Sequence, residues 1–148
     1  MKFMILNGPN LNLLGIREPD LYGAETYNDL LNKVQQYGKT IGVEVVCYQS
    51  NHEGDLVDAI HRAFFEKFDG MVMNPGAYTH TSIALLDAIK ATRIPTVEVH
   101  ISAVEKREDF RQISYIRSAC IHTITGQGTN GYLQAMDFLI GWNSGDAQ

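Results

Sequence analysis

The feature that most constrains the fold is a regular alternation of short apolar segments with longer segments of helical periodicity. Apolar runs bounded by turn residues predict five strands, over residues 2–7, 43–49, 70–74, 95–102 and 120–125. Helical patterns are found over about 27–41, 53–67, 79–91, 104–110 and 130–142. The strands are too apolar to leave one face in water, as is typical of parallel sheets covered on both faces. The chain is therefore predicted to be an α/β protein, a three-layer doubly wound domain with right-handed crossovers.

The number of strands favours one order within such a sheet. Five strands in a doubly wound domain indicate the flavodoxin-like order 2-1-3-4-5. Local signals support the helix starts: Thr26 is expected to cap the helix over 27–41, and Ser50 with Glu53 has the spacing of a capping box. Thr79 or Thr81 is expected to open the helix that ends near residue 91.

Length and composition indicate one domain and exclude some partners. We expect a single domain over 1–148, with a lid loop at about 11–24 and a frayed tail at about 143–148. The net charge of −5 and the pI near 5.4 argue against nucleic acid or an anionic membrane as partner. No apolar run could span a bilayer, and the first residues are apolar too briefly for a signal peptide. Cys47 and Cys120, in predicted strands at opposite edges of the sheet, are expected to be buried free thiols in a reducing cytoplasm.

Polar residues interrupt one apolar strand in a way that indicates a site. In the segment 95–102, Val97, Val99 and Ile101 alternate with Glu98, His100 and Ser102, so the three polar side chains share one face. They lie at the carboxyl end of the strand, where ligands bind in open parallel sheets. The alternative is a polar pair that is buried for structural reasons. More polar groups are expected at the same edge, from strand ends, the lid and nearby loops: Asn7, Asn10, Gln49, Asn74, Arg17, Tyr22, His80 and Arg111.

Several standard chemistries lack their residues. The chain contains neither a P-loop nor a G-x-S-x-G elbow, and no lysine falls at the carboxyl end of a predicted strand, which argues against a Schiff base. Carboxylates are too scarce there for a hard cation, and a zinc site built from Glu98, His100 and His80 is disfavoured. The stretch 126–131 matches G-x-G-x-x-G, but it follows the last strand, so a tight strand-to-helix turn is favoured over dinucleotide binding.

The remaining chemistry is general acid–base catalysis. His100 can transfer a proton, and Glu98 would fix its tautomer. Tyr22 is either a packed aromatic residue of the lid or a base; its anion at neutral pH would cost about 4 kcal/mol, of which the Arg17 cation could supply much. Asn10 and Asn74, with backbone N–H groups near Ser102, could hold an oxyanion or a carboxylate. Arg111 suits a carboxylate or a polyol.

These residues occur within motifs that resemble one family, the type II 3-dehydroquinate dehydratases. The motifs run in order along nearly the whole chain: Asn7-Gly8-Pro9-Asn10-Leu11-Asn12, Arg17-Glu18-Pro19 with Tyr22-Gly23, Asn74-Pro75-Gly76-Ala77 with Thr79-His80-Thr81-Ser82, Glu98-Val99-His100-Ile101-Ser102, and Arg107-Glu108-x-Phe110-Arg111. The resemblance implies a single catalytic domain that converts 3-dehydroquinate to 3-dehydroshikimate by trans elimination through an enolate. It implies no metal, no cofactor, and a trimer-based dodecamer.

The resemblance also implies roles for individual residues. Tyr22, kept anionic by Arg17, would abstract the C2 proton, and Asn10 would bind a water that stabilises the enolate oxygen. His100, oriented by Glu98, would protonate the leaving hydroxyl. The remaining roles concern substrate binding: the carboxylate would be held by Asn74 and the backbone at Ile101 and Ser102, the ring hydroxyls by His80 and Arg111, and a neighbouring subunit's site would be reached by Asp87.

Two positions depart from the family pattern. Ala103 stands where many relatives carry Asn, and Ile113 stands where many carry His. We expect these departures to affect surrounding contacts and the pH optimum rather than the reaction. The alternative function is a flavodoxin-like domain that binds a nucleotide or phosphate without catalysis, supported by the fold and by the stretch 126–131.

Overall fold

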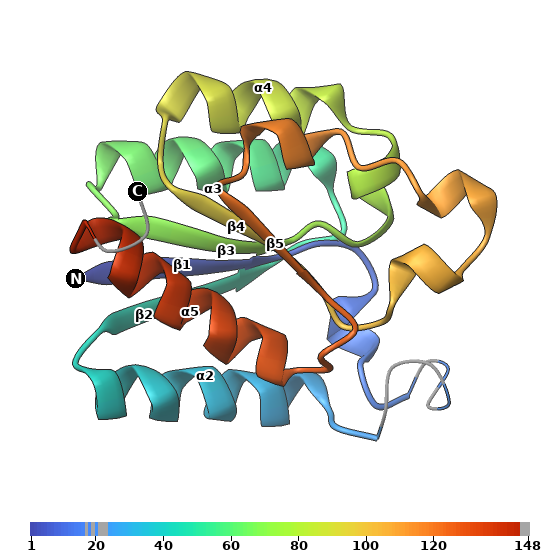
Figure 1. Ribbon diagram of the computed structural model, residues 1–148, viewed down its shortest axis with the longest axis horizontal. Coiled ribbons are helices and arrows are strands. Elements are labelled where there is room, and N and C mark those ends of the chain that lie inside the picture. The colour runs from blue at the N-terminus through green and yellow to red at the C-terminus, as the bar shows by residue number, and fades with distance from the viewer. Residues whose placement is uncertain (17, 19, 21–23, 146–148) are drawn as a thin grey trace.

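A five-stranded parallel sheet forms the middle layer of the protein, which we describe from a computed structural model covering residues 1–16, 18, 20 and 24–145. The strands are β1 (Lys2–Asn7), β2 (Glu44–Gln49), β3 (Gly70–Asn74), β4 (Thr96–His100) and β5 (His122–Thr125). They pair in the order β2-β1-β3-β4-β5, all parallel (Figure 1). The predicted strand order is confirmed.

Two pairs of helices cover the sheet, one pair on each face. Helices α2 (Tyr27–Ile41) and α5 (Asn130–Asn143) lie below the sheet in Figure 1, and α3 (Glu53–Phe65) and α4 (Ile83–Thr92) lie above it. The two cores follow from the period of 2 in a strand. In β1, Phe3 and Ile5 pack towards α2 and α5, whereas Met4 and Leu6 pack towards α3 and α4. The three-layer prediction is therefore confirmed.

The helix starts were predicted with mixed success. At α2 the capping box forms, because the Thr26 hydroxyl accepts from the Asp29 N–H and the Asp29 carboxylate accepts from the Thr26 N–H. At α3 the expected box is wrong: the N-cap residue is His52, and the Ser50 hydroxyl instead donates to the Asp55 carboxylate. At α4 the expected start is also wrong, since Ser82 is the N-cap and its hydroxyl accepts from Leu85 N–H.

The segment before α4 explains the second error. Residues Gly76–His80 form a separate 3₁₀ turn, η2, which lies at the carboxyl end of β3. Short 3₁₀ turns have no longer-range periodicity that a sequence pattern could reveal. Four others behave in the same way: η1 (Leu11–Leu13) inside the expected lid, η3 (Val104–Lys106) and η4 (Asp109–Arg111) in place of one helical segment, and η5 (Ile116–Ala119) before β5.

The ends of some elements differ from the expectation. Strand β4 stops at His100, two residues before Ser102, and β5 begins at His122, so Cys120 lies just outside a strand. Cys47 and Cys120 are free but half-buried rather than buried, because each lies on or beside an edge strand. Partial burial still raises the pKa of the Cys47 thiol to about 11 and that of Cys120 to about 12. Helix α5 includes Asn143, and the last tail residues, 146–148, lie outside the described residues.

The stretch 126–131 is the strand-to-helix turn that its position predicts. It joins β5 to α5, and Gly126 and Gly128 have φ angles of 73° and 61°, in the left-handed region that glycine favours. The N–H groups of both glycines donate to carbonyls after β4, on Ser102 and Ile101 respectively. The turn therefore fixes the chain that leaves β4 at the edge where the site was predicted. No helix in the described part of the chain is long and apolar enough to cross a membrane.

Candidate active site

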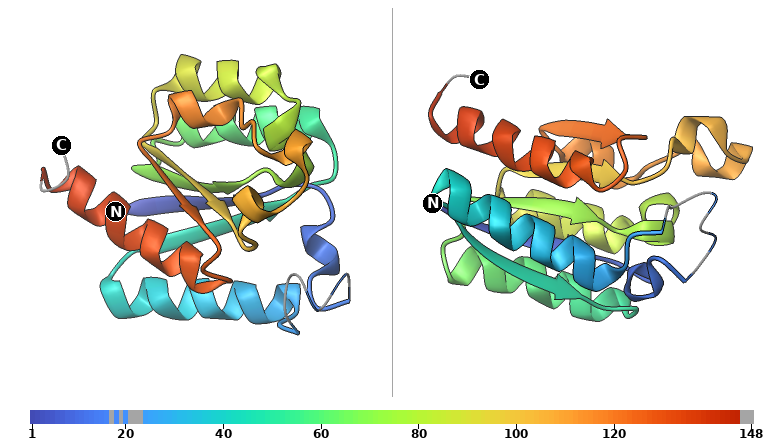
Figure 2. Two further views of the ribbon diagram at one scale, coloured as in Figure 1. Left: turned by 45° about the vertical axis from the view of Figure 1, so that its right-hand side comes forward. Right: turned by 90° about the horizontal axis from the view of Figure 1, so that it is seen from below.

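The loops after β1, β3 and β4 lie together at the carboxyl end of the sheet (Figure 2). A pocket opens between residues of these loops. The pocket and the open solvent at its mouth together span about 560 Å³. Most of the predicted site residues line it, and they come from three separate stretches of chain: Asn10, Asn74, His80, His100, Ile101, Ser102 and Arg111. The prediction that polar strand ends gather at one edge is therefore confirmed for these residues.

The loops after β1 and β3 approach each other closely at this edge. The Gly8 N–H donates to the Asn74 carbonyl over 2.7 Å, and a Cβ at Gly8 would lie 2.3 Å from the Pro75 carbonyl oxygen. Only glycine allows this contact. The next turn carries Asn10, which has a φ of 69° and whose N–H donates to the Asn51 side-chain oxygen. The close contact brings Asn10 and Asn74 to the same pocket wall.

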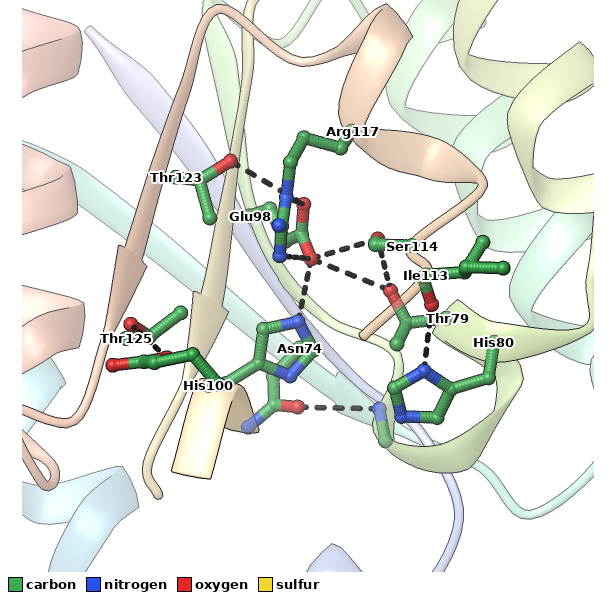
Figure 3. Close-up of polar contacts among 12 residues, drawn as sticks. Asn74, Thr79, His80, Glu98, His100, Ile113, Ser114, Arg117, Thr123 and Thr125 are labelled. Atoms are coloured by element: carbon green, nitrogen blue, oxygen red, sulfur yellow. Dashed lines mark hydrogen bonds and ion pairs between the residues drawn. The ribbon is translucent and has the colours of Figure 1, made fainter. Parts of the chain in front are cut away.

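The centre of the site is a buried pair formed by Glu98 and His100 on β4 (Figure 3). Glu98 is fully buried and His100 is 5% exposed, and the Nε2 of His100 lies 2.5 Å from the Glu98 Oε2. Burial raises the pKa of the Glu98 carboxyl, but hydrogen bonds from His100, Arg117 and Ser114 outweigh it and lower this pKa to about 2. Glu98 is thus a carboxylate at neutral pH, so His100 Nε2 carries the hydrogen and donates it. The Nδ1 atom of His100 is left for a ligand in the pocket.

His80 presents a neutral ring to the same pocket. Its Nδ1–H donates to the Ile113 carbonyl over 2.7 Å, because a carbonyl can only accept. Burial is the main cause that lowers the pKa of His80 below 6.5. At neutral pH its Nε2 therefore offers a lone pair, which suits a substrate hydroxyl. The contact uses the backbone carbonyl of residue 113, and the isoleucine side chain itself is 59% exposed.

A buried tyrosine fixes the amide of Asn74. Tyr132, on the first turn of α5, accepts from Asn74 Nδ2 over 2.9 Å and donates to Asn7 Oδ1 over 2.6 Å. The Gly76 N–H donates to Asn74 Oδ1, so each end of the amide has a defined partner. Complete burial is the main cause that raises the pKa of Tyr132, which keeps its proton on the oxygen.

We expect Tyr132→Phe to lower the free energy of unfolding by about 1–3 kcal/mol, because Asn7 and Asn74 lose a buried partner. The Asn74 amide would also lose its fixed orientation, so substrate binding should weaken. Urea denaturation and KM measure the two effects. Tyr37→Phe is the matched control, since the Tyr37 hydroxyl donates to Asp137 on the exposed side of α2 and α5, away from the pocket. Equal stability of the two variants would contradict the role given to Tyr132.

The other predicted residues fall into three groups. Arg111 is held beside the pocket by Glu108, with 2.6 Å between its Nε and the carboxylate. Asp87 is exposed on α4 and does not line the pocket of its own chain. Arg17 and Tyr22 lie outside the described residues, so their predicted roles stay predictions.

Sequence reasoning missed several residues that hold the site. In the sequence, Tyr132 has the pattern of a core aromatic and Arg107 is only one residue of a motif. In the structure, Arg107 lines the pocket and donates to the Ser102 hydroxyl over 3.5 Å. Thr79, Ser114 and Arg117 all contact Glu98 from loops. A buried carboxylate such as that of Glu98 needs several hydrogen-bond donors. The sequence therefore indicates that donors must be present, but it does not indicate which residues supply them. Among the described residues, no group of three or more His, Cys, Asp or Glu side chains could hold a metal ion.

The fold and the pocket define an α/β protein with an acid–base site for a small polar ligand. Comparison with known proteins identifies the family to which the chain belongs. The family model described as Dehydroquinase class II matches residues 1–140, and the chain belongs to this family. A 3-dehydroquinate dehydratase of Clostridium perfringens is 55% identical over 139 residues, which are 94% of this chain and 96% of the relative.

Solved structures agree with this assignment. A type II dehydroquinase from Butyrivibrio crossotus has a TM-score of 0.94 at 51% identity, covering 95% of this chain and 97% of that one. A type II dehydroquinase from Propionibacterium acnes has a TM-score of 0.89 at 37% identity, with 97% and 96% covered. The family resemblance inferred from the motifs and the flavodoxin-like fold inferred from the strand pattern are both confirmed.

Proposed function

We propose that the protein is a hydro-lyase that converts 3-dehydroquinate to 3-dehydroshikimate, a step of the shikimate pathway to the aromatic amino acids. The observation that carries the proposal is the buried Glu98–His100 pair at the pocket of a chain that belongs to the class II dehydroquinase family. An elimination of water needs one base and one acid, and the pair supplies the acid.

The proposed reaction is a trans elimination in two steps. Tyr22, as a phenolate beside Arg17, takes the C2 proton, and the electrons of the C–H bond form an enolate. A water held by Asn10 donates to the enolate oxygen. The enolate then collapses, the C–O bond breaks, and His100, entering this step protonated on both nitrogens, gives its Nδ1 proton to the departing hydroxyl, which leaves as water. No oxidant or reductant enters this balance, so we propose that neither a metal nor a cofactor is needed.

Substrate binding is assigned to the remaining lining residues. The substrate carboxylate is proposed to bind Asn74 and the backbone N–H groups of Ile101 and Ser102. The backbone at Ile101 and Ser102 is held in place, because its carbonyls accept hydrogen bonds from the N–H groups of Gly128 and Gly126. The ring hydroxyls are assigned to the neutral His80 and to Arg111, which suit an acceptor and a donor role respectively.

Assembly and location are part of the same proposal. We propose a dodecamer built from trimers, in which Asp87 contributes to the site of a neighbouring subunit. The exposed position of Asp87 on α4, away from its own pocket, supports such a role. A cytoplasmic location is supported by the two free cysteines at opposite sides of the sheet.

The test is turnover of 3-dehydroquinate by the purified protein, followed by the ultraviolet absorbance of the conjugated enone product. We expect turnover that is unaffected by a chelator and by borohydride added with the substrate. Loss of activity with the chelator would indicate a metal, and loss with borohydride would indicate a Schiff base. Absence of turnover, together with a thermal shift caused by a dinucleotide but not by quinate-like acids, would instead favour the binding-domain alternative.

A further inference from the structure

Arg117 binds the buried carboxylate of Glu98, the same group that binds His100. It lies on the 3₁₀ turn η5, with its side chain 44% exposed. Its Nε lies 3.0 Å from Glu98 Oε1 and its Nη2 lies 3.0 Å from Glu98 Oε2, so the two groups form a two-point contact (Figure 3). Such paired contacts fix the plane of a carboxylate as well as its charge.

The other partners of Glu98 are neutral hydroxyls or a group that exchanges protons. The Ser114 hydroxyl donates to Oε2 over 2.8 Å, and the hydroxyls of Thr79 and Thr123 lie at 3.4 and 3.3 Å. His100 changes its charge during the proposed reaction. Among the described residues that contact Glu98, Arg117 is therefore the one that carries a permanent charge.

We propose that Arg117 is a positioning residue, which holds Glu98 as an oriented carboxylate so that His100 is aimed into the pocket and releases its proton readily. The inference rests on the proposed dehydratase function for its kinetic consequences. Within the part of the chain that the structure describes, Arg117 bonds to Glu98 and does not line the pocket, so it acts through Glu98.

The charge balance explains the effect on the proton. Arg117 and Glu98 together are neutral, so a proton on His100 gives the group of three a net positive charge. Without Arg117, the same proton would leave a neutral carboxylate–imidazolium pair and would be held more tightly. A more tightly held proton makes His100 a weaker acid towards the leaving hydroxyl.

Other charged groups act on the same cluster and do not change with Arg117. His80 and Arg111 face His100 across the pocket, and His80 interacts electrostatically with His100 and Glu98. Cys120 interacts with Glu98, and Glu105 interacts with Arg117 from the loop after β4. These groups are the same in every variant at residue 117, so a difference between the variants reports the effect of the Arg117 charge on Glu98 and His100.

The first test is steady-state kinetics of Arg117→Gln and Arg117→Lys in the full-length protein, with 3-dehydroquinate as substrate. We expect kcat of Arg117→Gln to fall about tenfold, equivalent to about 1.4 kcal/mol of barrier, with little change in KM. Arg117→Lys keeps the charge and loses the two-point contact, so its kcat should lie between those of Arg117→Gln and the original protein. Arg62→Gln is the matched control, because Arg62 also pairs with a glutamate, Glu66, but on the outer surface of α3.

The second readout is the pH dependence of kcat. Since Arg117→Gln holds the His100 proton more tightly, the basic limb of its profile should move to higher pH, whereas that of Arg62→Gln should not move. If Arg117 had only a structural role, its replacement by Gln would lower the free energy of unfolding without moving the basic limb of the kcat profile. Unchanged kcat and an unchanged basic limb in Arg117→Gln would overturn the proposal. If that variant does not fold, a kcat and basic limb of Arg117→Lys equal to those of the original protein would overturn it.

Acid unfolding separates this inference from the proposed function. The pKa of Glu98 is about 2, below its ordinary 4.5, so its stabilising contribution is complete above pH 4.5 and is lost as the pH falls towards 2. Arg117→Gln raises this pKa, so the contribution becomes smaller: the variant should have a lower Tm than Arg62→Gln at neutral pH, and its fall of Tm on acidification below pH 4.5 should be smaller and end at higher pH. Identical acid unfolding of the two variants would overturn the role of Arg117, whereas absent turnover in the original protein would overturn only the function.

Discussion

Replacing His100 by alanine is expected to lower kcat for 3-dehydroquinate by about 10²–10⁴-fold, the usual contribution of a positioned general acid. His100 lies on the pocket wall, and its Nε2–H is held 2.5 Å from the Glu98 carboxylate, which leaves Nδ1 to serve the substrate. Alanine removes this proton donor without touching Asn74, His80 or Arg111. KM should therefore change much less than kcat.

Two controls sharpen the result. His61→Ala removes an exposed imidazole on α3 and should leave kcat unchanged. Added imidazole should restore part of the turnover of His100→Ala, because the pocket would have room for it at the position of the lost ring. A kcat of His100→Ala within a few-fold of the original protein would contradict the role of His100 as the acid.

The architecture could be predicted because each element carries its own signal. The alternation of Phe3 and Ile5 with Met4 and Leu6 in β1 already requires two covered faces, and the structure places these pairs in separate cores. The edge at which each strand ends could be predicted even where its last residue could not, so the positions of Asn74 and His100 at one edge followed from parallel order alone.

The supporting contacts could not be predicted because they depend on distant loops. Arg117 reaches Glu98 across 19 residues of chain from a 3₁₀ turn, and Tyr132 reaches Asn7 across 125 residues. Neither a 3₁₀ turn nor the first turn of a helix has a periodicity that assigns a side chain to one partner. Sequence patterns indicate that Glu98 must have donors, but only the fold identifies them.

The helix starts show how local and tertiary effects compete. Thr26 caps α2 as predicted, and its hydroxyl accepts from the Asp29 N–H. Ser50 has equally good spacing with Glu53, but its hydroxyl is used by Asp55, and His52 becomes the N-cap residue. Thr26 and Ser50 have similar capping patterns in the sequence, but only the Thr26 hydroxyl forms the cap bond, because the Ser50 hydroxyl donates to Asp55 instead.

Tyr22→Phe is expected to lower kcat by about 10²–10⁴-fold as well, because phenylalanine has no oxygen with which to take the C2 proton. Tyr22 lies outside the described residues, so this prediction rests on the family and on chemistry. A tyrosine normally titrates near pH 10, and one neighbouring cation such as Arg17 lowers a pKa by about 1–3 units, enough to supply much of the required phenolate.

Exchange of the C2 proton with deuterated solvent distinguishes Tyr22 from His100. Tyr22→Phe should bind 3-dehydroquinate but neither eliminate water nor exchange the C2 proton, because the first step is lost. His100→Ala keeps the base, so it should exchange the proton while eliminating slowly. Tyr37→Phe, which loses only the bond to Asp137 on the far helices, should behave as the original protein does. Because the two losses act on successive steps, exchange that persists in Tyr22→Phe and stops in His100→Ala would require the roles of acid and base to be interchanged.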